Sequence, residues 1–372
     1  MGAFDAPSLL TRLLASPFLT LLRPLYTFLL YLRTPPRTRL PSTRPVRVVC
    51  ISDTHTLTLD DVADGDLLIH AGDMTNDGTL AEIQAQIDWI KTLPHAHKVV
   101  IAGNHDSWLD ERIRPRIPSG PSPSSSSSSS SSSEDDYEHV TNPPTPSTLD
   151  WGEIHYLQNR TLALPFPPTP THPTPRILTL HGVPQIPPLD PSPSTTLHAF
   201  QYPPDTNPYT THPIPPSTDI LITHSPPLHH CDLFPHSIGC AHLLAQVWRV
   251  RPSLLVFGHV HAAGGVVERG FYDCAQRSWE ELCSRRCEKG EIWEKGERGV
   301  LGWVVRGGWW RDALDWRMWK GMVGVVFGAA RAVVWTRVWG GETAGVGREG
   351  WIINAACKAE SGLRGRGIVV EI

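Results

Sequence analysis

Five short apolar segments of this chain are each followed directly by polar residues of the kind that hold metal ions. The segments have the length and composition of buried β-strands, and they span residues 46–51, 66–70, 98–101, 219–223 and 254–257. In an α/β sheet the carboxyl ends of the strands open onto one crevice. Because five such coincidences are hard to obtain by chance, we expect the residues behind the segments to meet in space.

The residues that follow these segments carry oxygen or nitrogen donors. They are Asp53, His55, Asp73, Asn104, His105, Asp106, His224, His259 and His261. Taken singly, each motif could be an ordinary turn or polar cap. Together, carboxylate, imidazole and amide donors suit Mn, Fe or Zn better than an all-oxygen calcium site. The donors are too many for one ion, whereas two ions that share a carboxylate could clamp a phosphate and activate water.

The order of the apolar segments predicts an α/β domain. Residues 79–93 carry apolar side chains at helical spacing and end before Pro94, so we expect a helix between the second and third strands. An alternation of strands and helices is typical of α/β folds. The remaining predicted elements are strands at 154–157, 176–180, 351–354 and 368–372, and helices at 241–250 and 271–288.

Two segments interrupt this pattern. Residues 114–148 contain the serine run 124–133 and a proline cluster, and they lack the apolar area needed to fold, so we expect a disordered surface insertion. Residues 289–350 mix tryptophan with glycine, arginine and valine in no clean period. We interpret this second segment either as an aromatic surface that faces a membrane or as a variable insertion.

The N-terminal segment 1–46 differs from the rest of the chain. It is a basic, apolar tail, and its stretch 13–32 contains Arg23 near the middle. A central arginine disfavours a membrane span, and the stretch lacks the uninterrupted apolar region of a secretory signal. Residues 8–32 could instead lie on a membrane surface as a peripheral contact, or serve as an organelle address. The alternative is a frayed tail or a helix packed on the domain.

The charge balance argues against nucleic acid as a partner. The chain has 33 lysines and arginines and 37 aspartates and glutamates, a net charge of −4, and no basic stripe accompanies the motifs. Its 7 cysteines stand at irregular spacings, so we expect a reducing, cytoplasmic location, with membrane association as an option. The histidines and cysteines between 229 and 240 match no tight zinc spacing, and we expect a polar loop at the pocket rim there.

The ordered motifs resemble those of a known family. The motif D-x-H at Asp53, G-D at Asp73, G-N-H-D at 103–106, a lone His224 and G-H-x-H at 258–261 resemble the calcineurin-like metallophosphoesterase superfamily. The phrases around these motifs are similar to its metallophosphoesterase-domain-containing branch, in a fungal-type member.

The resemblance implies an α/β fold of the metallo-dependent phosphatase type, a four-layer αββα sandwich over residues 47–372 that holds two divalent metal ions. One ion would be bound by Asp53, His55 and His261. The second would be bound by Asn104, His224 and His259. Asp73 would bridge the two ions. His105 would act as general acid or stabilise the transition state, and Asp106 would orient its ring.

The activity implied by the resemblance is hydrolysis of a phosphoester by a hydroxide that bridges the two ions. Relatives in this branch act on phosphodiesters, cyclic nucleotides included, so we expect a phosphodiesterase that uses Mn, Fe, Zn or Mg. The alternatives are a phosphomonoesterase or protein phosphatase with the same site, and a non-catalytic scaffold of the same fold. Every ligand position and His105 are present, which disfavours the scaffold.

Overall fold

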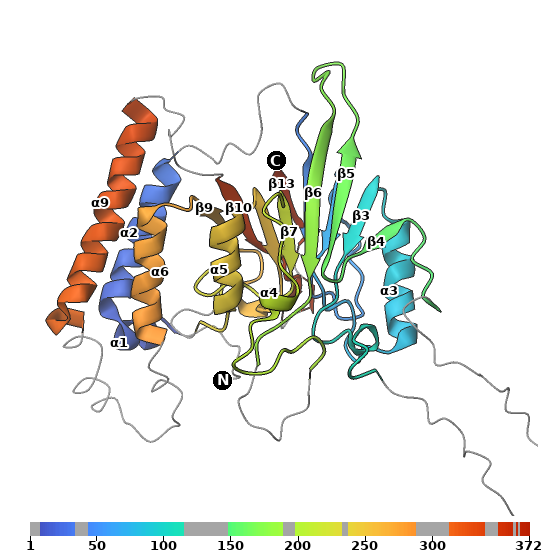
Figure 1. The fold of residues 1–372 in the computed structure, drawn as a ribbon, viewed down its shortest axis with the longest axis horizontal. Coiled ribbons are helices and arrows are strands. Elements are labelled where there is room, and N and C mark those ends of the chain that lie inside the picture. The colour runs from blue at the N-terminus through green and yellow to red at the C-terminus, as the bar shows by residue number, and fades with distance from the viewer. Residues whose placement is uncertain are drawn as a thin grey trace, which may run out of the picture.

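The computed structural model describes residues 8–33, 44–114, 148–188, 198–232, 237–287, 312–338, 349–359, 362–363 and 365–372. Most of these residues belong to two β-sheets and the helices around them (Figure 1). The serine run and much of the tryptophan-rich segment lie outside the described residues, so the predicted disorder of the former is not addressed by the structure.

The first sheet has 5 strands in the order β13-β1-β2-β3-β4. They are β1 (Arg47–Ile51), β2 (Leu67–His70), β3 (His97–Val100), β4 (Ile154–Tyr156) and β13 (Ile368–Glu371). Strands β1 to β4 are parallel, and β13 pairs antiparallel with β1. The carboxyl ends of β1, β2 and β3 therefore lie at the same edge of the sheet.

The second sheet has 6 strands in the order β5-β6-β7-β8-β10-β9. They are β5 (Arg160–Phe166), β6 (Arg176–Val183), β7 (Ile220–Thr223), β8 (Leu254–Phe257), β9 (Val267–Gly270) and β10 (Gly350–Asn354). Strands β6, β7, β8 and β10 are parallel, and β5 and β9 are antiparallel edge strands. These two edge strands were not predicted from the sequence. A short pair, β11 (Lys358–Ala359) and β12 (Gly362–Leu363), follows β10.

The two sheets pack face to face around a hydrophobic core that both of them line. Side chains alternate along each strand, so Val48 of β1 lies between the sheets while Val49 contacts the helix on the outer face. Helix α3 (Leu80–Thr92) covers the outer face of the first sheet, and α4 (Pro208–Thr211) and α5 (Ala241–Val250) cover that of the second. Figure 1 shows α3 and α5 on opposite sides of the sheets. The fold is the four-layer α/β sandwich that the sequence indicated.

Local sequence fixes the ends of the two covering helices. Thr79 caps α3 by accepting the Glu82 amide, and the Glu82 carboxylate accepts the Thr79 amide in return, which is a complete capping box. Helix α5 begins after Cys240, whose Sγ accepts the Leu243 amide, and ends where Arg251 adopts a left-handed conformation. Both helices therefore start and stop within about one residue of the predicted positions.

A further helical layer packs beside α5 (Figure 1). It consists of α1 (Leu9–Ala15), α2 (Pro17–Leu32), α6 (Cys274–Cys287) and α9 (Trp316–Val338). Its own hydrophobic core joins Leu19 and Leu22 of α2 to Trp279 and Leu282 of α6 and Val325 of α9. Residues 9–32 of the N-terminal segment form helices in this layer, as one of the alternatives predicted. Part of the tryptophan-rich segment is helical although its pattern has no clean period.

A buried histidine ties the loop after β7 to this helical layer. His230 Nδ1 lies 3.0 Å from Glu268 Oε2 on β9, and its Nε2 lies 2.8 Å from Glu280 Oε1 on α6. Burial alone would lower the pKa of His230, but the two carboxylates outweigh burial and raise it to about 10. Instead of forming a polar rim as expected, His229, His230 and Cys231 are buried.

We expect His230→Ala to lower the free energy of unfolding at neutral pH by about 3–5 kcal/mol, because it leaves two carboxylates without their buried cation. The pKa of His230 rises from roughly 6.5 in an unfolded chain to about 10 in the fold. The stabilisation is therefore complete below the lower value and is lost as the pH rises through the higher one. Urea unfolding at a series of pH values measures both effects.

The exposed His212→Ala variant is the control for loss of an imidazole, and it should leave the unfolding curve and its pH dependence unchanged. If wild type and His230→Ala lost stability equally between neutral and alkaline pH, the charge assigned to His230 would be excluded.

Candidate metal centre

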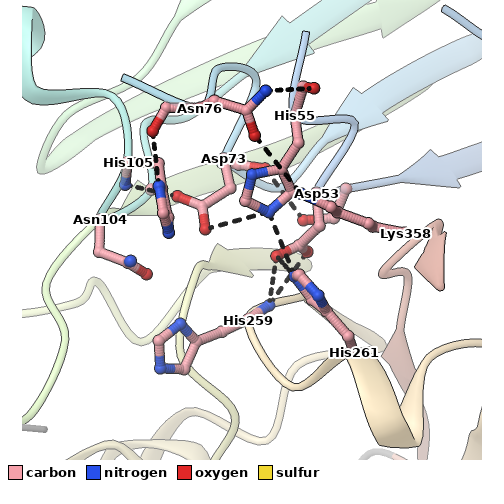
Figure 2. Close-up of polar contacts among 12 residues, drawn as sticks. Asp53, His55, Asp73, Asn76, Asn104, His105, His259, His261 and Lys358 are labelled. Carbon is pink, nitrogen blue, oxygen red and sulfur yellow. Dashed lines mark hydrogen bonds and ion pairs between the residues drawn. The ribbon is translucent and has the colours of Figure 1, made fainter. Parts of the chain in front are cut away.

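Donor side chains from both sheets meet at the carboxyl ends of the strands. The structure brings together the seven ligand positions predicted from the sequence, which stand behind β1, β2, β3, β7 and β8 and are Asp53, His55, Asp73, Asn104, His224, His259 and His261. Figure 2 shows most of these side chains pointing toward one another around a common space. The convergence follows from the parallel strands of the two sheets.

The first group of donors has ligand atoms that all lie within 4.8 Å of one another, and it comprises Asp53, His55 and His261. The Nε2 atoms of His55 and His261 are 3.2 Å apart, and His261 Nε2 is 3.1 Å from Asp53 Oδ1. Asp53 also accepts the His259 backbone amide at 3.0 Å, which fixes the carboxylate. Two imidazole nitrogens and a carboxylate oxygen that face one another form a donor set suited to a divalent transition metal.

The second group comprises Asp73, His224 and His259, again with ligand atoms within 4.8 Å of one another. His224 Nδ1 donates to the Ala71 carbonyl oxygen at 2.9 Å, which leaves Nε2 directed at the site. That Nε2 lies 3.3 Å from Asp73 Oδ2 and 2.9 Å from Asn104 Oδ1. Asn104 therefore stands with the second group and adds an amide oxygen to it.

Asp73 stands between the two groups. Its Oδ2 is 3.3 Å from His224 Nε2 in the second group and 3.8 Å from His55 Nε2 in the first. Its Oδ1 accepts the backbone amide of His105 at 2.7 Å. One buried carboxylate thus contacts donors of both groups, which is the position that a bridging ligand would occupy.

Close approach of the backbone explains the glycines in the motifs. A Cβ at Gly258 would lie 2.0 Å from Asp53 Oδ2, and one at Gly103 would lie 2.3 Å from Asp73 Oδ1, so a side chain at either position would displace a donor carboxylate. Asp53, His55 and Asp73 themselves have positive φ angles of 55°, 47° and 53°. Such conformations cost about 1–3 kcal/mol each and collect at functional sites.

The two buried carboxylates of the site are ionised, and the imidazoles around them differ in charge. Burial alone would raise the pKa of Asp73, but His224 lowers it far below its usual range. Burial lowers the pKa of His55 to about 4 and that of His259 to about 3, so both imidazoles are neutral at pH 7. Burial also opposes the charge on His224, but Asp73 and Asp53 raise its pKa to about 9. The two carboxylates thus demand positive charge, which a metal ion would supply.

His105 lies on the more accessible side of the site. Its ring is half-buried, with its centroid 4.8 Å from that of His55, and its Nδ1 donates to the Asn76 carbonyl oxygen at 2.7 Å (Figure 2). The structure corrects the role that we expected for Asp106, because the ring is oriented by Asn76. The Asp106 carboxylate instead joins the loops behind β2 and β3 by accepting the backbone amides of Met74, Thr75 and Gly103.

Three residues near the site were missed by the sequence analysis. Asn76, besides holding His105, donates from Nδ2 to the His55 carbonyl oxygen at 3.1 Å. Lys358 Nζ donates to Asn76 Oδ1 at 3.3 Å and places a positive charge at the rim. The ring of His198 has its centroid 6.3 Å from that of His105. None of the three residues directly follows one of the five apolar segments, so their positions in the sequence gave no signal.

Comparison with known proteins agrees with this geometry. A profile of the calcineurin-like phosphoesterase family matches residues 46–263, which is more than half of the chain. The chain is 33% identical over 240 residues to metallophosphoesterase domain-containing protein 1 of Homo sapiens, covering 60% of this chain and 63% of that protein. It is 31% identical over 239 residues to a UPF0046 protein of Caenorhabditis elegans, and the match covers 62% of this chain and 70% of that protein.

A further relative is much longer than this chain. It is the "Probable rhamnogalacturonate lyase C" of Emericella nidulans, which is 38% identical over 242 residues, and the match covers 64% of this chain but 19% of that protein. The likeness is therefore to a small part of that protein. The profile, the shorter relatives and the two joined donor groups lead to one conclusion: this chain belongs to the calcineurin-like phosphoesterase family, in the branch of metallophosphoesterase-domain-containing proteins.

Proposed function

We propose that this protein is a metal-dependent phosphoester hydrolase that prefers phosphodiesters, cyclic nucleotides among them. The observation that carries the proposal is the joining of two donor groups by Asp73, with His105 beside them on the accessible side. Family membership supports hydrolase chemistry, and the preference for diesters is supported by the resemblance to this branch. The complete donor set favours an enzyme over a scaffold of the same fold.

The donors of the two groups suit two divalent ions drawn from Mn, Fe, Zn and Mg. The first group would hold its ion with two imidazoles and a carboxylate, and the second with two imidazoles, an amide oxygen and the shared Asp73. When bound, such ions would polarise phosphoryl oxygens and lower the pKa of water. The chain itself keeps the donors in place through Gly103, Gly258 and the strained backbone around them.

His105 is the residue suited to protonate the leaving oxygen. Because its Nδ1 donates to the Asn76 carbonyl, Nε2 is the atom that gains and releases a proton. Lys358 donates to the side-chain oxygen of the same residue, Asn76, so we place its ammonium beside His105, where a phosphate anion would approach. His105 and Lys358 together provide a proton donor and a positive charge at the accessible side of the donor groups.

We expect His105→Ala to lower kcat by about 10²–10⁴-fold, the usual contribution of a general acid, while metal content stays unchanged because the ring is not among the donors. The assay uses bis(4-nitrophenyl) phosphate, cyclic nucleotides, a phosphomonoester and a phosphopeptide, each with Mn, Mg, Zn and Fe. Faster turnover of the diesters supports the proposed specificity.

His155→Ala, a half-buried histidine on β4, is the matched control and should retain full activity. Full activity of His105→Ala toward every substrate would remove His105 from the reaction. Preference for the monoester or the phosphopeptide would make the protein a phosphomonoesterase or a protein phosphatase instead.

We expect Asp73→Asn to reduce occupancy of both metal positions, because one carboxylate contacts both donor groups. Asp53→Asn, which removes a donor carboxylate from the first group, should mainly reduce one of them. Elemental analysis of the purified variants, together with calorimetric titration of the metal-free proteins with Mn, measures the two effects. If Asp73→Asn bound as much metal as the wild type, Asp73 could not be the bridging ligand.

A further inference from the structure

The helical layer exposes an apolar stripe along α9. Trp316, Trp319, Val323, Phe327 and Val334 recur at helical spacing on the outer side, where Val323 and Phe327 are 65% and 68% exposed. The opposite side of α9 carries Met318, Val325 and Ala329, which are buried against the rest of the layer. A helix that is apolar on both sides is normally covered on both sides, so the outer stripe of α9 requires an occupant.

Helix α2 carries a second apolar stripe beside the first. Its exposed residues Leu21, Leu25, Phe28 and Tyr31 are again at helical spacing, and they lie opposite the buried Leu19, Leu22 and Tyr26. At one end of the helix pair, the Phe18 ring packs edge-on against Trp319 at 4.9 Å. At the other end, Arg337 Nε donates to the Leu32 carbonyl oxygen at 3.0 Å. The two helices therefore run parallel and adjacent, and their stripes flank one seam.

The charges on these helices all have one sign. Helices α1, α2 and α9 contain no aspartate or glutamate, and they carry the basic residues Arg12, Arg23, Arg317, Lys320, Arg331 and Arg337. On α9 the exposed basic residues and the tryptophans lie toward the ends, and Val323 and Phe327 lie between them. Apolar side chains flanked by tryptophan and basic residues match the interface of an anionic membrane better than the surface of another protein.

A cavity between α1 and α2 continues this surface. It has a volume of about 660 Å³, and its lining includes Phe28 and Tyr31 of the α2 stripe together with Arg12 and Arg23. Arg12 and Arg23 line the same cavity, and the pKa of Arg12 is lowered by burial and by the charge of Arg23. Glu268 also faces this pair, with its Oε1 4.0 Å from Arg23 Nη2. Two neighbouring guanidinium groups beside an apolar wall are complementary to a phosphate head group with its acyl chain.

We propose that the outer face of α1, α2 and α9 docks on an anionic lipid bilayer, with a lipid phosphate in the cavity that contains Arg12 and Arg23. Among the described residues, the segment Trp316–Trp335 of α9 is also long and apolar enough to cross a membrane. Crossing would pull Met318, Val325 and Ala329 out of the core of the layer, whereas docking leaves that core intact. The helices therefore lie on the membrane. This inference is independent of the proposed function.

The test is flotation of the full chain with vesicles of phosphatidylcholine, with and without phosphatidylserine. We expect the wild type to float with the anionic vesicles. The double variant Val323→Glu/Phe327→Glu should bind at least about tenfold more weakly, because it puts charge on the buried side of the interface. Arg12→Gln/Arg23→Gln should lose about tenfold or more of its affinity for anionic vesicles only. Ile177→Glu, at an equally exposed apolar residue on β6, is the control and should float like the wild type.

Circular dichroism and thermal unfolding establish that each variant is folded before its flotation is compared. Three results would overturn the proposal. In the first, the folded wild type fails to float with any vesicle. In the second, Val323→Glu/Phe327→Glu floats as well as the wild type. In the third, the wild type does not bind vesicles but forms a dimer in size-exclusion chromatography, and Val323→Glu/Phe327→Glu is a monomer. That result would make a second copy of the chain the occupant of the stripe.

Discussion

Two buried carboxylates at the junction of the sheets impose most of the remaining features of the site. Asp53 and Asp73 both come from the first sheet, and burying such charges is unfavourable unless positive charge or hydrogen bonds compensate them. His224, His259 and His261, which surround them, come from the second sheet. The attraction between carboxylates and imidazoles, or a metal ion between them, therefore acts across the sheet interface. Binding of a cation at this place would therefore also stabilise the packing of the two sheets.

The parts of the fold that could be read from the sequence are those in which a local pattern matches a buried environment. The central strands are short apolar runs because both of their faces are covered. The two edge strands of the second sheet gave no such signal: β9 has the sequence Val-Glu-Arg-Gly, and β5 contains Pro165. Helix α9 was missed for the opposite reason. Apolar residues occupy its outer as well as its inner side, so no amphipathic period marks it as a helix.

The same reasoning separates what was predictable in the site from what was not. Donor side chains behind parallel strands have to converge, so their types and positions were sufficient to predict that they meet. Their division between two ions came from the resemblance to the family. The contact that orients His105 comes from the backbone carbonyl of Asn76. Every residue has such a carbonyl, so the residue type does not indicate this contact. Asp106 was misassigned because adjacency in sequence suggested contact with the ring of His105. The Asp106 carboxylate instead accepts backbone amides of the loops behind β2 and β3, and these contacts depend on how the two loops fold.

The helical layer is connected to the site by a continuous path of contacts. The loop that begins at His224 leads to His230, which hydrogen bonds to Glu280 on α6. Trp279 and Leu282 of the same helix pack in the core that α2 and α9 share. Because His230, Glu280 and the core of the layer are all buried, we expect the layer to move together with the donor residues. A bilayer docked on α2 and α9 would then hold the donor groups at a fixed orientation to its surface, and only substrates that reach that orientation would be accessible to His105.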